Sequence, residues 1–309
     1  LNILPPYIFI NLYNIKFNNI NRFKMNIKDI EFYKKNGFLV KECLISKNLI
    51  STIKRKISYL IKKDILLSKN IKKFEYLKAG KKNHFVRLKD PVAQDKIFYS
   101  LSRNKKIISI VSKLLGGTAR FHHSKLNFKL PSKKGGVVHW HQDWAFYPHT
   151  NDDLLAVGIY LEECNETHGP LKVFAGTHRK KLYDHHYKGS FVGRINPDIE
   201  KLNPKKAISL TGPAGTVTFH HVRTIHGSGL NFTSNKRPLL IFGYAAIDAW
   251  PLTYDSGSSL DPNSNLQNYN KLITKGSPTL YPRIKSVPIK IPLPRKSDSL
   301  YDLQKIKKK

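Results

Sequence analysis

The N-terminal third of the chain carries apolar residues at helical spacing. Within residues 45–63 they recur every three or four positions, as on one face of an α-helix, and Ser46 precedes them as a suitable N-cap. Residues 91–117 predict two further helices, the second ended by Gly116 and Gly117. We therefore expect a helical layer in this part of the chain.

From residue 118 onward the pattern changes to short apolar runs and to alternation with period two, which is the spacing of β-strands. Clusters of turn residues such as PSKKGG, HTNDD and NETHGP separate these runs. Many short strands with a supporting helical layer predict an α+β fold, either a β-sandwich or a jelly roll. Residues 179–213 are charged and poor in strand signal, so we interpret them as a candidate insertion between strands, and such loops often cover sites.

The same patterning divides the chain into three parts. Met25 is the only methionine, and regular patterning begins directly after it, so we expect residues 1–24 to be a non-native or disordered N-terminal extension. Residues 25–250 are expected to form the folded domain. Residues 251–309, which are rich in proline and serine and end in KIKKK, are expected to form a loosely packed C-terminal extension.

The formal net charge of +33 over 309 residues raises the question of nucleic-acid binding. The charge is unevenly distributed, however. Residues 137–178 contain six acids against one lysine, a net of −5, whereas residues 283–309 have a net of +7. Abundant lysine, isoleucine and asparagine are also what AT-rich coding produces. We expect a solvated basic surface, and a non-catalytic, polyanion-binding jelly roll remains the alternative from another functional class.

Cysteine usage and hydropathy bear on the compartment. Cys43 and Cys164 are far apart and form no CxxC pair, so the sequence predicts neither a disulfide framework nor a zinc knuckle. No apolar run reaches about 18 residues, the length that crosses a bilayer. The apolar start of the chain lacks the basic region and cleavage site of a signal peptide. We expect a cytoplasmic protein without membrane spans.

The chemistry is concentrated in residues 138–149, VHWHQDWAFYPH. On a strand, His141 and Asp143 face the same side, which places an imidazole and a carboxylate together as two metal ligands. One more histidine would complete a 2-His-1-carboxylate triad, which leaves coordination positions open, as non-haem Fe(II) oxygenases require. His139 shares that face, so the spacing alone does not decide which histidine binds.

The other ligand candidate is His226, which Gly227, Ser228 and Gly229 follow. Arg237 lies eleven residues later, at the start of an apolar run, and a hairpin turn through LNFTSN would return it beside His226. An arginine at the inner end of a barrel needs an anionic partner, and a carboxylate ligand would bind it in bidentate fashion. The joint pattern predicts a metal site, which neither segment predicts alone.

These segments resemble the phytanoyl-CoA dioxygenase (PhyH) family over residues 25–250. HWHQDWAFYPHTNDDLLAVGIYLEECNETHGPLKVFAGTH is similar to the family's first metal segment, HGSGLNFTSNKRPLLIFGY to its second, and FYKKNGFLVKECLISKNLI to its N-terminal opening. The resemblance implies a double-stranded β-helix, a cupin-like jelly roll with N-terminal supporting helices. It also implies dependence on Fe(II), 2-oxoglutarate and O₂.

Carried over residue by residue, the resemblance implies that His141, Asp143 and His226 ligate iron. Arg237 would bind the distal carboxylate of 2-oxoglutarate with the assistance of Ser228, and His139 would lie near the cosubstrate. The implied reaction hydroxylates a small organic molecule while 2-oxoglutarate is converted to succinate and CO₂. Desaturation, epoxidation or cyclisation with the same ligands is the alternative within enzymes.

The resemblance has departures and leaves some residues open. The family's Asn-Gly is His168–Gly169 here, and its Pro-Gly-Ser-His is AGTH at residues 175–178; both changes lie in turns. Asp143 stands where halogenating relatives carry Gly or Ala, which favours hydroxylation over chlorination. Several further residues have either a substrate-facing or a structural interpretation: the aromatic residues Trp140, Trp144, Phe146 and Tyr147, and the arginines Arg87 and Arg179.

Overall fold

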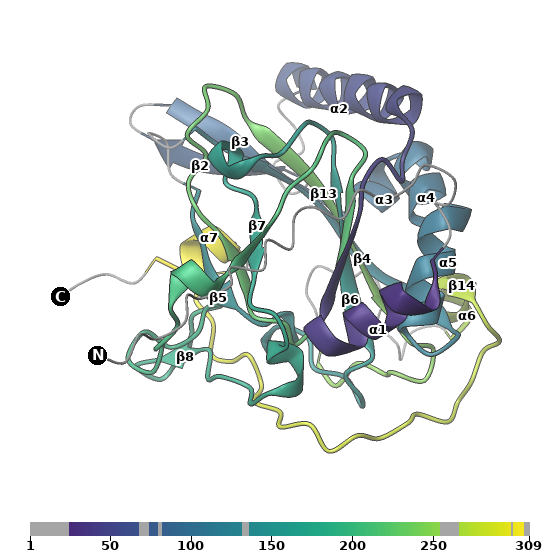
Figure 1. The fold of residues 1–309 in the computed structure, drawn as a ribbon. Helices are drawn as coiled ribbons and strands as arrows, with labels where there is room; N and C mark the ends of the chain where they lie inside the picture. The colour runs from purple at the N-terminus through teal and green to yellow at the C-terminus, as the bar shows by residue number, and fades with distance from the viewer. Residues whose placement is uncertain are drawn as a thin grey trace, which may run out of the picture.

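The computed structural model describes residues 25–67, 74–79, 82–131, 136–253, 266–297 and 299–305. The N-terminal extension predicted for residues 1–24 lies outside this range. Two antiparallel sheets face each other in the described part of the chain, with helices gathered on the outside of the larger one (Figure 1). The predicted α+β jelly roll is confirmed.

The larger sheet runs in the order β1-β11-β6-β13-β4-β3-β2, with β14 added beside β4. Every neighbouring pair is antiparallel, as in a jelly roll. Its strands are β1 (Phe38–Lys41), β2 (Phe74–Ala79), β3 (Lys82–Lys89), β4 (Ala119–Lys129), β6 (Leu154–Tyr160), β11 (Val217–His221), β13 (Arg237–Ala245) and β14 (Ile273–Lys275). The β2–β3 hairpin extends the sheet by two strands that the sequence pattern did not predict.

The smaller sheet runs in the order β10-β7-β12-β5. Its strands are β5 (Val138–His141), β7 (Leu171–Val173), β10 (Ile208–Leu210) and β12 (His226–Ser228). The segment interpreted as an insertion, residues 179–213, contains only β10, the short hairpin of β8 (His186–Tyr187) and β9 (Ser190–Phe191), and the 3₁₀ turn η5 (Pro204–Lys206). β5 and β12, the strands that carry the predicted histidine ligands, are neighbours in this sheet.

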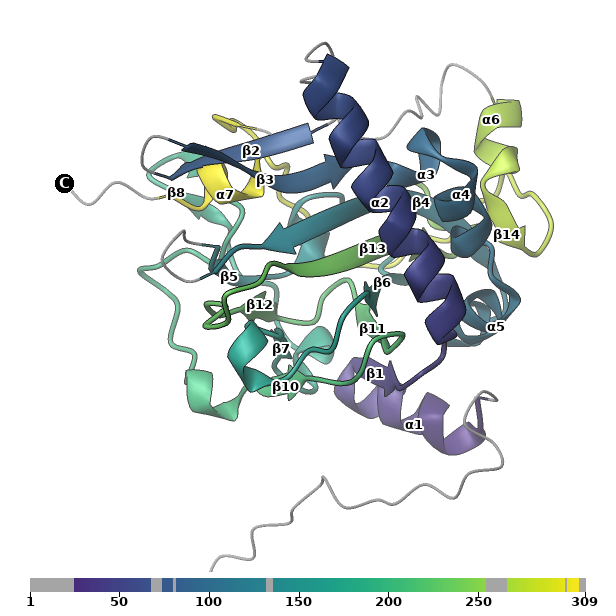
Figure 2. The ribbon, with the colours of Figure 1, turned by 90° about the horizontal axis from the view of Figure 1, so that it is seen from above.

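The helical layer covers the outer face of the larger sheet. It contains α1 (Ile27–Asn36), the long α2 (Lys47–Leu67), α3 (Pro91–Gln94), α4 (Lys96–Ser102) and α5 (Lys105–Leu114). Figure 2 shows α2 crossing above the strands. The two helices predicted within residues 91–117 are three, because Asp95 is extended and caps a new helix by accepting from the backbone N–H of Ile97.

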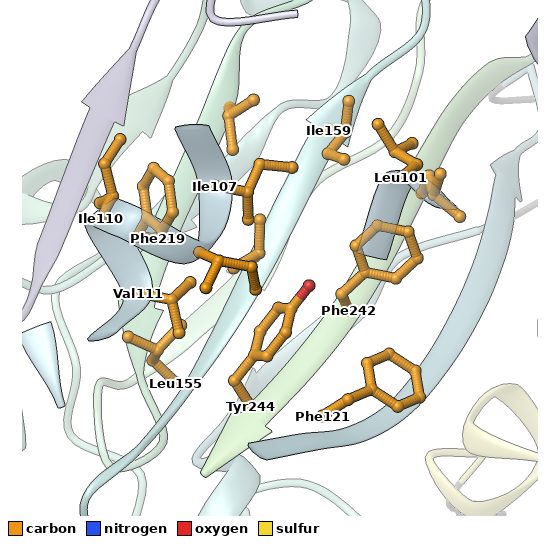
Figure 3. Close-up of a cluster of buried hydrophobic side chains, with 14 of the residues drawn as sticks. Leu101, Ile107, Ile110, Val111, Phe121, Leu155, Ile159, Phe219, Phe242 and Tyr244 are labelled. Atoms are coloured by element: carbon orange, nitrogen blue, oxygen red, sulfur yellow. The ribbon is translucent and has the colours of Figure 1, made fainter. Parts of the chain in front are cut away.

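The main hydrophobic core lies between these helices and the sheet. Figure 3 shows side chains of α4 and α5 meeting those of β6, β11 and β13, with Ile107 and Val111 packed over Leu155 and Tyr244. The Tyr244 hydroxyl donates to the carbonyl of Ser102 at 2.6 Å, so this buried polar group is satisfied. The core fixes the outer face of the larger sheet and leaves its inner face for the site.

After β13 the chain forms α6 (Leu266–Lys271) and β14, and then passes beneath the domain to α7 (Leu300–Leu303) on the other side (Figure 1). Several ion pairs and hydrogen bonds anchor it. Arg283 pairs with Asp248 at 2.9 Å, and the indole N–H of Trp144 donates to the carbonyl of Pro288 at 3.0 Å.

Among the described residues, no helix combines the length and the hydropathy needed to cross a bilayer.

Candidate metal centre and its surroundings

Three predicted ligands converge between the two sheets. His141 ends β5 and His226 begins β12, and the two are direct partners in the antiparallel ladder. Asp143 lies two residues after His141, at the start of the 3₁₀ turn η2 (Asp143–Ala145). One ligand atom from each of the three lies within 4.8 Å of the others, and all three residues are buried.

The backbone fixes which nitrogen of each histidine faces the centre. His141 donates its Nδ1–H to the carbonyl of His139 at 2.8 Å, and His226 donates its Nδ1–H to the carbonyl of Thr224 at 2.9 Å. A carbonyl can only accept, so Nδ1 carries the proton and Nε2 keeps its lone pair. Both Nε2 atoms lie 3.8 Å from Asp143 Oδ1. This arrangement is how metal-binding histidines are oriented in proteins.

The protonation states also suit a cation. Burial lowers the pKa of both His141 and His226, so they are neutral near pH 7. Burial would raise the pKa of Asp143, but the neighbouring imidazoles, beginning with His226, and the charge of Lys125 hold it well below its usual value. Two neutral imidazoles and one carboxylate are the donor set that a divalent metal takes.

Gln142, between the predicted ligands His141 and Asp143, holds the turn in place. Its side chain donates to the carbonyl of Arg223 at 2.9 Å and accepts from the backbone N–H of Tyr183 at 2.9 Å. Its backbone N–H donates to Nε2 of His185 at 2.9 Å, and burial lowers the pKa of that imidazole to about 3, which keeps it an acceptor. Residues 183–185 therefore hold in place the turn that carries Asp143.

The predicted cosubstrate arginine is buried, but it arrives by another route than expected. β12 and β13 belong to different sheets, so residues 229–236 cross between the sheets and the predicted hairpin is wrong. Arg237 pairs in register with Lys129 of β4, and its guanidinium donates to the carbonyl of Gly169 at 3.0 Å. Its Nε has no hydrogen-bond partner in the described structure.

Lys129 is a second buried cation at the same place, and no local pattern in the sequence distinguishes it from other lysines. It donates to the carbonyl of Gly229 at 2.8 Å, just beyond Ser228 of β12. Burial and the nearby charge of Arg237 lower its pKa well below the usual value. Neither Arg237 nor Lys129 forms an ion pair within the described part of the chain. Two such cations side by side suit a carboxylate ligand.

The remaining predicted residues differ in their surroundings. Ser228 is buried on β12, opposite Leu171 and Val138. His139 is half-buried, and burial, with the charge of Arg194, lowers its pKa to about 4. Its backbone N–H donates to the side chain of Gln304, the C-cap residue of α7, at 2.9 Å. Their roles toward a cosubstrate stay predictions.

The aromatic and arginine candidates also differ in whether they lie near the predicted metal ligands. Phe146 packs edge-on against His141, with ring centroids 5.8 Å apart, whereas Trp140 packs on Phe174. Trp144 and Tyr147 belong to the main core. Arg179 is exposed, and Arg87 is paired with Glu75 and donates to Asn127 at 2.8 Å.

The fold and the site together define a class. A buried facial set of two histidines and one carboxylate on a double-stranded β-helix is typical of non-haem Fe(II) oxygenases. The chain belongs to the phytanoyl-CoA dioxygenase (PhyH) family, whose model matches residues 33–239. The resemblance expected from the sequence is confirmed.

Relatives and solved structures agree with this assignment. The chain is 46% identical over 200 residues to the probable alpha-ketoglutarate-dependent hypophosphite dioxygenase of Stutzerimonas stutzeri, a match that covers 63% of this chain and 66% of that protein, just under two thirds. It is 25% identical to the ectoine dioxygenase of Bordetella bronchiseptica over 72% of this chain and 76% of the relative. The crystal structure of EctD from S. alaskensis with bound Fe superposes with a TM-score of 0.62 at 19% identity, covering 90% of this chain and 92% of that one. That likeness shows the shared fold.

Proposed function

We propose that this protein is an Fe(II)- and 2-oxoglutarate-dependent dioxygenase that hydroxylates a small molecule. The observation that carries the proposal is the convergence of His141, Asp143 and His226, with both histidine Nε2 atoms fixed as lone-pair donors. Iron and 2-oxoglutarate, when bound, supply the oxidation: O₂ is split between the substrate and the succinate that forms as CO₂ is lost.

The chain's own residues would bind and orient the reactants. The buried cations Arg237 and Lys129 fit the distal carboxylate of 2-oxoglutarate, because neither has an acidic partner among the described residues. Ser228, on the strand that carries His226, is proposed to assist, and His139 is proposed to lie near the cosubstrate. Burial of the site excludes bulk water, which strengthens these charge interactions.

For the substrate we propose a small oxyanion of reduced phosphorus, such as hypophosphite. The 46% identity to the Stutzerimonas stutzeri protein supports this choice. Lys125 also supports it: it occupies the same face of β4 as Asn127 and Lys129, and its charge reaches both His141 and Asp143. Insertion of one oxygen atom into a P–H bond would convert hypophosphite to phosphite, while the second oxygen atom ends in succinate.

We also propose how the chain is divided into parts and in which compartment the protein works. We propose residues 25–250 as the catalytic domain and residues 251–309 as a C-terminal extension. The free thiols Cys43 and Cys164 support a reducing compartment such as the cytoplasm. We do not propose a nucleic-acid partner, because residues 137–178, which carry His141 and Asp143, have a net charge of −5.

The test measures succinate and phosphite together. Purified protein receives Fe(II), 2-oxoglutarate, O₂ and hypophosphite, and succinate is measured by chromatography while phosphite is followed by ³¹P NMR. Equal rates of succinate formation in wild type and His141→Ala would refute the oxygenase. Succinate that forms with another small molecule and never with hypophosphite would refute only the substrate. Desaturated or cyclised products would favour the alternative chemistry, and salt-sensitive DNA retention without turnover would favour the polyanion-binding protein.

A further inference from the structure

A further buried histidine, His220, lies against the predicted metal ligand Asp143. It belongs to β11, where its backbone pairs with Phe38 of β1 and Ala156 of β6. The residue is only 4% exposed, and its ring centroid lies 4.5 Å from that of His226. None of the roles assigned above uses it.

The two oxygens of Asp143 face different partners. Oδ1 lies 3.8 Å from Nε2 of His141 and 3.8 Å from Nε2 of His226, so it faces the metal centre. Oδ2 lies 3.6 Å from Nε2 of His220. A modest rotation of the carboxylate or of the imidazole brings this second separation into the hydrogen-bond range of about 2.7–3.2 Å.

Neither ring nitrogen of His220 makes a hydrogen bond in the described structure. A neutral imidazole carries one N–H, and leaving a buried donor unpaired costs about 1–3 kcal/mol. The adjacent Asp143 Oδ2 is a charged acceptor, which makes the strongest kind of partner for that N–H.

We propose that His220 is a positioning residue that donates its Nε2–H to Oδ2 of Asp143 and thereby restricts the carboxylate to binding metal through Oδ1 alone. The inference rests on the proposed function. A carboxylate that binds through both oxygens would take one more coordination position. The triad with a single carboxylate oxygen leaves the positions that 2-oxoglutarate and O₂ require.

The test compares two substitutions with a matched control. His220→Phe keeps the ring shape and removes the donor, whereas His220→Gln keeps an N–H donor. His149→Phe is the control, because His149 is equally buried and has an unpartnered Nε2, yet contacts no predicted ligand. Thermal unfolding of each variant first identifies any that do not fold.

Metal binding is then measured by calorimetry with Mn(II), and ligand geometry by the visible absorption of the Co(II)-loaded protein. We expect His220→Phe to lower Mn(II) affinity about 10–100-fold and to change the Co(II) absorption. His220→Gln should recover most of both, and His149→Phe should resemble wild type. Unchanged affinity and absorption in a folded His220→Phe would overturn the proposal. So would complete loss of metal in both His220 variants, because His220 would then be a ligand.

These readouts separate the inference from the proposed function. If wild type binds metal and His220→Phe changes that binding, the positioning role holds even where no succinate forms. If wild type forms succinate and His220→Phe binds metal normally, the oxygenase stands and the positioning role fails.

Discussion

His141 and His226 face each other across neighbouring antiparallel strands, with ring centroids 4.1 Å apart. Each ring is oriented by the carbonyl two residues before it in the chain, that of His139 or Thr224. The strand ladder therefore sets the distance between the two imidazoles, and local backbone contacts set their direction. Asp143 is the member of the site that stands outside this ladder.

Asp143→Asn should weaken metal binding at least 10-fold while the fold is retained. The amide has nearly the same shape but lacks the negative charge that a divalent cation needs in this buried place. Calorimetry with Mn(II) measures the affinity. Asp198→Asn, an exposed change, is the control and should bind as wild type does. Equal affinity in the two variants would remove Asp143 from the ligand set.

Arg237→Gln should raise the KM for 2-oxoglutarate by about 10–100-fold. A charge-assisted hydrogen bond contributes about 1.5–3 kcal/mol, and each 1.4 kcal/mol is a factor of ten in affinity. Steady-state rates of succinate formation at varied 2-oxoglutarate give the value. Arg179→Gln provides the comparison, since Arg179 is exposed, and it should leave this KM unchanged. A normal KM in Arg237→Gln would assign the cosubstrate carboxylate elsewhere.

His149→Phe should reduce the loss of stability between pH 7 and pH 5. Burial lowers the pKa of His149 to about 3, whereas an unfolded histidine titrates near 6.5. In that range the unfolded state binds the extra proton, so stability falls as pH falls. The wild type should lose ~2 kcal/mol more than the variant over this interval, as measured by urea unfolding at each pH. Parallel pH profiles would show that His149 does not remain neutral in the fold.

Asp152→Asn should destabilise the protein at neutral pH and lose this effect in acid. Burial raises the pKa of Asp152, but hydrogen bonds from Arg223 and Lys285 contribute to lowering it to about 2, below the unfolded value of about 3.9. The stabilisation is present above pH ~4 and disappears as pH falls toward ~2; we expect about 1–2 kcal/mol after allowance for solvent screening. Urea unfolding of both proteins across this range measures it. A constant difference between them would contradict the assignment.

Much of the site could be predicted from the sequence, because its ligands lie in short segments with local rules. His141 and Asp143 are two residues apart on an extended stretch. Strand β5 ends at His141, but Gln142 keeps extended backbone angles, so the 3₁₀ turn begins only at Asp143. The helical layer could be predicted for the same reason. Apolar spacing along α2 depends only on neighbouring turns.

The rest depends on contacts between distant segments. Arg237 reaches its place through pairing of β13 with β4, which the sequence does not encode in any local signal. In the sequence, nothing distinguishes Lys129 from the other lysines of its strand, or His220 from any histidine in an alternating strand pattern. Their burial against Gly229 and Asp143 arises only when the sheets assemble. The β2–β3 hairpin was missed because its alternation is weak.

The contact between α7 and β5 has a consequence for biosynthesis. β5 is the outermost strand of its sheet, and Gln304 covers it by accepting from the backbone N–H of His139 and donating to the carbonyl of Gly193. Exposed strand edges pair with other chains and lead to aggregation. Ile195 already covers part of this edge by donating to the carbonyl of Trp140, but Gln304 lies 165 positions after His139, so on the ribosome the N–H of His139 stays unpaired until residue 304 has emerged. We therefore expect the His139 end of β5 to be open to pairing with other chains during this interval of synthesis.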